Sequence, residues 1–244
     1  MTDVDSVQGV APSAAAGARP RAVSDRQLVN AALRQDLVAF IFRVFQTLNP
    51  GTEYRHNWHI DAIAHQLTRC AGGEDRRLLI TQPPRSLKSI CVSVAYVAWM
   101  LGHDPSRKFI CVSYSTELAA DLARLFRAVV EADWYRQVFP RMRAAKDTGL
   151  EFVTTEGGGR YATSVGGTLT GRGADTIIID DPMKAEEAMS KVVRDRVLGW
   201  YRSTLVSRLN DKTEGGLIVV MQRLHEEDLA GYLLAQGGWR HLDL

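Results

Sequence analysis

The chain has 244 residues, of which 45% are hydrophobic, so it can bury a sizeable core in one large domain or two small ones. Its 30 basic and 28 acidic side chains leave a net charge of +2, which does not indicate a protein that binds nucleic acid by bulk charge; contact with phosphates must come from a local patch. The three cysteines form no C-x-x-C pair, which argues for reduced, buried thiols.

The N-terminal segment predicts a tail and not a targeting signal. Residues 1–22 are rich in Ala, Ser, Gly and Pro, and they contain early acids but no apolar core, so we expect them to be disordered. The longest apolar stretch, ICVSVAYVAWML, has only about 12 residues, whereas a membrane-spanning helix needs about 20. It therefore predicts a buried helix.

Helices and a first strand are expected in the N-terminal half. Ser24 is placed to cap one long helix that runs to about residue 48, where Asn-Pro-Gly ends it. A second helix is expected over 61–70. RLLITQ (77–82) predicts a buried strand, which leads into a helix from Lys88 to Gly102. KFICVSYS (108–115) predicts the next strand.

Strands and helices continue to alternate in the second half. We next expect a helix over 117–133, two short strands around the Gly-Gly-Gly turn and a flexible loop, GGTLTGRGAD. They are followed by a strand in TIIIDDP, a helix over 190–209, a strand in GGLIVVMQR and a short helix in EEDLAGYLLAQGG. Because each strand is a nearly continuous apolar run, the pattern predicts a mostly parallel sheet covered on both faces, a three-layer α/β/α sandwich.

The turn TQPPRSLKSI (81–90) suggests a phosphate-binding loop. Lys88 and Ser89 stand where the motif GxxxxGK[ST] ends, but Gln82 and Leu87 occupy the two glycine positions. Backbone N–H groups of such a loop can still hold phosphate oxygens. Lys88, expected to be exposed, would supply a charge, and Ser89 a hydroxyl for Mg²⁺. The alternative is an ordinary strand-to-helix connection.

Two later strands deliver polar groups to the same edge of the sheet, where ligands of such folds bind. TIIIDD is typical of a Walker B strand: Asp180 would hold Mg²⁺ through water and Asp181 would polarise the attacking water. The alternative is a pair of carboxylates that cap the turn before Pro182. Gln222, at the end of LIVVMQ, is a candidate sensor of the γ-phosphate. Together the three motifs favour a nucleotide site.

At these motifs the sequence resembles the N-terminal ATPase domain of the large terminase subunit, the DNA-packaging protein of tailed phages. The matching segments are NWHIDAIAHQL (57–67), PPRSLKS (83–89), WMLGHDPS (99–106), SYSTELA (113–119), GRGADTIIIDDP (171–182) and VMQRLHEEDLAG (220–231). The family is similar in using Pro-Pro-Arg rather than glycines in its phosphate loop. The resemblance implies a P-loop NTPase of the RecA-like, ASCE class over 51–244, preceded by an N-terminal helix at 23–50. It also implies that the C-terminal nuclease domain of the family is absent from this chain.

The resemblance further implies a function and a set of site residues. The function would be Mg²⁺-dependent ATP hydrolysis that drives double-stranded DNA into a capsid. Partners would be the portal protein, the small terminase subunit and further copies in a homo-oligomeric ring, in the cytoplasm of an infected bacterium and without a membrane. The residues expected to bind ATP are Gln82, Pro83, Pro84, Arg85, Ser86, Leu87, Lys88, Ser89 and, near the adenine, Trp58 and His59.

Further roles are implied for three polar side chains. Arg85 would reach the γ-phosphate in its own subunit, Arg172 would reach that of a neighbouring subunit, and Gln222 would couple the phosphate state to movement. For Trp58 the alternative is packing of its helix onto the core. Two other functions stay open: a nucleotide-binding structural module of the packaging complex without turnover, which Leu87 favours, and a fragment of a superfamily-2 helicase-like ATPase.

Two charged clusters are interpreted more conservatively. His225, Glu226, Glu227 and Asp228 resemble a metal cluster, but they stand at a helix start, where acids favour the helix dipole, so we expect a cap. The basic side chains of the helix over 190–209, together with a loop group, are a candidate DNA-facing surface or simply a solvated face. They are Lys191, Arg194, Arg196, Arg202, Arg208, Arg141, Arg143 and Lys146.

Overall fold

The computed structural model describes residues 24–244, so the predicted tail (1–22) lies outside the described residues. Its centre is an eight-stranded sheet with the order β3-β4-β5-β2-β6-β7-β1-β8. Five neighbouring pairs are parallel: β5–β2, β2–β6, β6–β7, β7–β1 and β1–β8. Among the described strands, only β3–β4 and β4–β5 are antiparallel. The strands are β1 (Arg77–Thr81), β2 (Lys108–Ser113), β3 (Ala144–Asp147), β4 (Glu151–Thr154), β5 (Gly159–Ser164), β6 (Thr176–Asp180), β7 (Gly216–Met221) and β8 (Arg240–Asp243).

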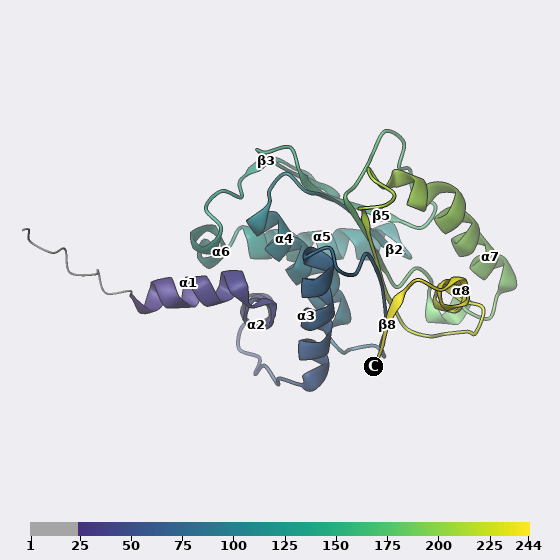
Figure 1. Ribbon diagram of the computed structural model, residues 1–244, viewed down its shortest axis with the longest axis horizontal. Helices are drawn as coiled ribbons and strands as arrows, with labels where there is room; N and C mark the ends of the chain where they lie inside the picture. Colours follow the sequence, from purple (N-terminus) through teal and green to yellow (C-terminus); the bar gives the residue numbers. More distant parts are fainter. Residues whose placement is uncertain (1–23) are drawn as a thin grey trace, which may run out of the picture.

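Helices cover both faces of this sheet, as Figure 1 shows. On one face lie α1 (Asp25–Gln35), α2 (Leu37–Leu48), α3 (Trp58–Ala71), α4 (Val97–His103), α5 (Thr116–Val130) and α6 (Asp133–Val138). On the other face lie α7 (Lys191–Trp200) and α8 (Leu229–Gln236). The predicted three-layer α/β/α architecture with a mostly parallel sheet is therefore confirmed.

Alternate residues of the central strands enter two separate hydrophobic cores. In β1, Leu78 and Ile80 pack under α2 and α3, whereas Leu79 packs on the side of α7 and α8. All three side chains are fully buried. Because both faces are covered, the central strands are continuous apolar runs, and this pattern allowed their positions to be predicted correctly.

The helix expected over 24–48 is instead two helices that meet at Asp36. Ser24 does cap α1, through a capping box with Gln27. Asp36, however, has an extended backbone (φ −116°, ψ 109°), and its side chain accepts a hydrogen bond from Val38 N at 2.8 Å. Asp is among the preferred N-cap residues, so one side chain starts a new helix inside an unbroken apolar pattern. Both helices contribute to the core that they share with α3.

Other differences from the expected elements are local. The helix after the predicted phosphate loop contains a π-helical segment, Ile90–Tyr96, and the helix expected over 190–209 is α7 followed by a π-helical segment, Tyr201–Leu205. The sequence did not predict α6 or the short polar strands β3 and β8. Between residues 24 and 244, no helix combines the length and the apolar character that crossing a membrane requires.

Candidate nucleotide-binding site

The loop after β1 adopts glycine-like backbone angles without containing glycine. Leu87, which stands at a glycine position of the motif, has φ 64°, and Arg85 has φ 62°. For ordinary L-residues this left-handed conformation costs roughly 1–2 kcal/mol. The Leu87 side chain packs against the core, which anchors the loop. The loop is held further by Ser86, whose hydroxyl donates to Pro83 O at 2.6 Å and whose carbonyl lies 3.2 Å from the His59 ring.

Lys88 is buried and paired, which corrects the expectation of an exposed side chain. Its exposed fraction is 6%, and its Nζ lies 2.8 Å from Asp181 Oδ2. Asp181 follows β6 with φ 45°, and its other oxygen accepts a hydrogen bond from the backbone N–H of Gln222 at 3.1 Å. The residues after β1, β6 and β7 are thus brought together, because these three strands are neighbours in the sheet.

Asp180 is the last residue of β6 and is almost fully buried, with 1% of its surface exposed. Ser89 Oγ donates to one carboxylate oxygen at 2.9 Å, and Ser93 Oγ donates to the other at 2.5 Å. Burial and the neighbouring charge of Asp181 raise the pKa of Asp180 to about 6. Sequence reasoning missed Ser93, although its position one helical turn after Ser89 was a usable signal.

The residues present fit a magnesium ion. Mg²⁺ takes hard oxygen ligands and typically uses one or two carboxylates together with water and substrate phosphates. The Ser89 hydroxyl and the Asp180 carboxylate supply such oxygens side by side. A cation there would also offset the burial that disfavours the charged form of Asp180.

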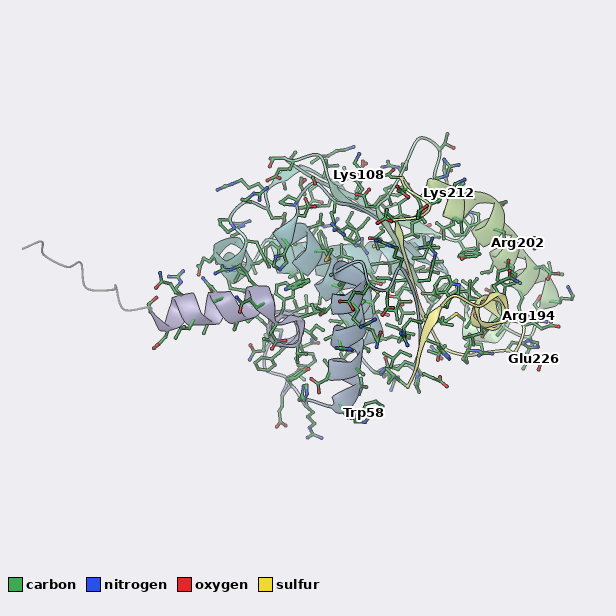
Figure 2. All side chains as sticks on the ribbon, viewed as in Figure 1. Trp58, Lys108, Arg194, Arg202, Lys212 and Glu226 are labelled. Atoms are coloured by element: carbon green, nitrogen blue, oxygen red, sulfur yellow. The ribbon has the colours of Figure 1, made fainter. Side chains whose placement is uncertain are left out.

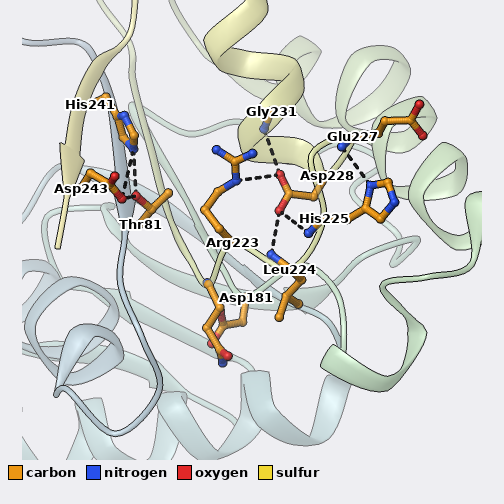
Figure 3. A network of polar contacts seen from close by, with 11 residues as sticks. Thr81, Asp181, Arg223, Leu224, His225, Glu227, Asp228, Gly231, His241 and Asp243 are labelled. Carbon is orange, nitrogen blue, oxygen red and sulfur yellow. Dashed lines mark hydrogen bonds and ion pairs between the residues drawn. The ribbon is translucent and has the colours of Figure 1, made fainter.

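The cluster at 225–228 is a helix cap, as predicted. Asp228 is completely buried, and its carboxylate accepts hydrogen bonds from Gly231 N at 2.9 Å and from Leu224 N at 3.0 Å. Figure 3 shows these contacts together with Arg223, whose guanidinium lies 3.5 Å from the same carboxylate. A methyl group on Gly231 would lie 1.8 Å from Glu226 O, so only glycine fits in this turn.

A cavity of about 300 Å³ lies beside the loop, at the carboxyl ends of β1 and β7. Gln82 lines it with a buried side chain whose Oε1 has no hydrogen-bond partner. A larger cavity of about 450 Å³ opens at the amino ends of the strands. Two carboxylates that line it are already engaged in hydrogen bonds: Asp175 accepts one from Lys108 N, and Asp211 accepts one from Thr213 N. We therefore locate the candidate site at the carboxyl ends of the strands, where Gln82 Oε1 has no hydrogen-bond partner and Lys88 contacts Asp181.

The residues expected near the adenine lie at the start of α3. Trp58 is 65% exposed, so its ring does not pack α3 onto the core, and that alternative is wrong. Figure 2 shows Trp58 at one end of the molecule, with Lys108 and Lys212 at the other. His59 reaches the phosphate loop through its contact with the Ser86 carbonyl.

Arg172 lies at the opposite edge of the sheet from Lys88 and Asp181. It precedes β6, whereas Asp181 follows it, and a strand rises roughly 3.3 Å per residue. Its Nη1 lies 2.5 Å from Glu151 Oε1, and its guanidinium lies 3.7 Å from the centre of the Tyr161 ring. Within one copy of the chain Arg172 therefore does not join the site, and its role toward a neighbouring subunit stays a prediction.

Glu151→Gln is expected to destabilise the fold by about 1 kcal/mol at pH 7. Hydrogen bonds from Arg172 and Lys146 lower the pKa of Glu151 from 4.5 to about 2. A lowered pKa means that this stability is present above pH 4.5 and is lost as the pH falls toward 2. Urea unfolding should show a gap between the two proteins at pH 7 that narrows below pH 4.5. A gap that does not change with pH would mean that Glu151 acts by packing and not by charge.

Most cations of the predicted basic surface are exposed, although several of them pair with carboxylates and one is buried. Arg194 has 6% of its surface exposed and donates to Ala188 O and to Glu227, so it is structural and not DNA-facing. The remaining cations of the set are partly paired too. Such pairs are Lys191–Asp195, Arg141–Glu156 and Lys146–Glu151. Arg202, labelled in Figure 2, remains exposed.

The sheet and its helix layers define a RecA-like α/β fold, and comparisons with known proteins agree. Over 176 residues the chain is 27% identical to the terminase large subunit of Enterobacteria phage T3, which covers 70% of this chain and 29% of that protein. It superposes on the crystal structure of the HK97 bacteriophage large terminase with a TM-score of 0.55 at 14% identity, covering 81% of this chain and 40% of that one. No protein-family profile matches.

The resemblance to the phage terminase large subunit is therefore confirmed, by sequence with the phage T3 protein and by fold with the HK97 protein. The chain spans less than half the length of either relative.

Proposed function

We propose that the chain is the ATPase motor domain of a phage terminase large subunit, which hydrolyses ATP to drive double-stranded DNA packaging. The observation that carries the proposal is the pairing of Lys88 with Asp181 at 2.8 Å, next to that of Ser89 with Asp180 at 2.9 Å. A phosphate-loop lysine and a hydroxyl after β1, together with two carboxylates at the end of β6, are the groups that phosphoryl transfer requires; the two parallel strands flank β7.

Each residue would have a separate task. The loop N–H groups and the ammonium of Lys88 bind the phosphates, and Arg85 adds positive charge in the same subunit. Asp181 polarises the attacking water by accepting its proton. Ser89 and Asp180 would hold Mg²⁺, which neutralises phosphate charge when bound. Trp58 and His59 would contact the adenine base.

The remaining assignments rest on the resemblance to terminases. Gln222, whose N–H donates to Asp181, would report the phosphate state to the loop behind it. Arg172 would act on the nucleotide of a neighbouring copy in a ring. Double-stranded DNA, the portal protein and the small terminase subunit are the proposed partners, and the cytoplasm of the infected host is the proposed location.

Phosphate release by the purified chain tests the proposal. With ATP we expect release that requires Mg²⁺ and stops with a chelator, because Ser89 and Asp180 present a cation site but no positive charge of their own. The assay is run with and without double-stranded DNA. ATP binding without release in either condition would favour a nucleotide-binding module without turnover, and absence of ATP binding would remove the nucleotide site altogether.

A further inference from the structure

Ser93 makes a buried contact with the carboxylate of Asp180. It lies in the π-helical segment Ile90–Tyr96, and its side chain has no exposed surface. Val92 and Val94, which flank it in the sequence, are also fully buried, so this part of the helix lies inside the protein. A hydroxyl in such surroundings is costly unless it is hydrogen-bonded. Its partner is Asp180 Oδ2, at 2.5 Å.

Ser89 precedes the π-helical segment and Ser93 lies within it, and their hydroxyls contact different oxygens of the same carboxylate. Ser89 donates to Oδ1 and Ser93 donates to Oδ2. The terminal torsion of an Asp side chain is broad, so a single hydrogen bond leaves the plane of the carboxylate poorly defined. Two hydrogen-bond donors at different oxygens fix the plane of the carboxylate. Ser89 is only partly buried, and it can turn toward a cation, whereas Ser93 is enclosed.

We propose that Ser93 is a positioning residue for the cation site: it fixes one oxygen of Asp180 so that the other oxygen faces the Ser89 hydroxyl. This inference rests on the proposed function, because it assumes that Asp180 and Ser89 bind Mg²⁺. Residues that orient metal ligands typically change metal affinity by about 10–100-fold when they are removed. Ser93 itself does not touch the cation or the nucleotide.

The test measures Mn²⁺ binding to the full chain in the presence of ADP, by electron paramagnetic resonance, so that no turnover is needed. Ser93→Ala is expected to weaken Mn²⁺ binding by about 10–100-fold, while ADP affinity without metal stays unchanged. Ser93→Thr and Ser93→Val form a matched pair, since both add a methyl group and only Thr keeps the hydroxyl. Thr is expected to retain Mn²⁺ affinity and Val to lose it.

Thr154→Val is the control for loss of a buried hydroxyl elsewhere, since Thr154 donates to Pro105 O far from Asp180 along the chain. It should lower the midpoint of unfolding without affecting Mn²⁺ binding.

If Ser93→Ala folds and binds Mn²⁺ as the wild type does, Ser93 has only a structural role and the inference is wrong. If the wild type itself fails to bind Mn²⁺ with ADP, the proposed function fails and the inference falls with it. If Ser93→Val does not fold, the comparison of Ser93→Ala with Ser93→Thr decides.

Discussion

Lys88→Ala is expected to lower the rate of phosphate release by at least about 100-fold, because the loop loses the charge that stabilises the transferred phosphoryl group. The variant should also be less stable by about 1–3 kcal/mol, since a half-buried carboxylate is left without its partner. That carboxylate belongs to Asp181, whose Oδ2 lies 2.8 Å from Lys88 Nζ. Phosphate-release kinetics and urea unfolding measure the two effects separately.

A double variant separates catalysis from stability. Lys88→Ala with Asp181→Asn removes both charges, so most of the lost stability should return while phosphate release stays absent. Lys108→Ala is the matched control, because Lys108 is exposed at the amino end of β2 and should affect neither quantity. Normal phosphate release by Lys88→Ala would overturn the assignment of the phosphate loop. Unchanged stability would show that the ion pair contributes nothing to the fold.

The central strands and the motifs after them were predictable because their signals are local. A strand buried on both faces is a continuous apolar run, and polar residues after it must lie at the carboxyl edge of a parallel sheet. TIIID and LIVVM satisfy both conditions, and β6 and β7 are neighbours in the sheet. The sequence alone therefore gave the architecture and the group of residues at that edge.

The features that were missed depend on single side chains or on distant contacts. Asp36 divides the first helix although the apolar spacing continues across it. The burial of Lys88 and the contact of Ser93 with Asp180 depend on how the helix after the loop packs over β6, which no local pattern encodes. The strands β3 and β8 are short and mostly polar, so they lack the apolar signal of the centre.

The position of Arg172 relative to the site follows from the order of the elements in the sequence. A residue that precedes a parallel strand lies at the opposite edge from a residue that follows it. Arg172 precedes β6 and Asp181 follows it, so the two cannot meet within one copy. The same rule supports Arg85 and Gln222, which follow β1 and β7, as the side chains nearer the phosphates.

Asp181→Asn is expected to slow phosphate release by about 100–10,000-fold, because an amide cannot accept a proton from the attacking water. The change is conservative for the backbone. Asp181 has φ 45°, and Asn adopts this left-handed region more readily than most residues. The Asn carbonyl oxygen can still accept the hydrogen bond from Gln222 N. The substitution therefore removes a negative charge and leaves the shape of the loop intact.

The same variant should bind ATP more tightly, by about 3–10-fold. The Asp181 carboxylate competes with phosphate for Lys88, whose Nζ it contacts at 2.8 Å, and it also repels the phosphate charges. Isothermal titration calorimetry with ATP and Mg²⁺ measures the change in affinity. Asp180→Asn is the contrasting variant, because loss of the proposed cation ligand should weaken binding of the ATP–Mg²⁺ complex. Weaker ATP binding by Asp181→Asn would mean that Asp181 holds the cation or the loop. Tighter binding with lost turnover is the result expected if Asp181 opposes the bound phosphates and acts only when the water attacks the γ-phosphate.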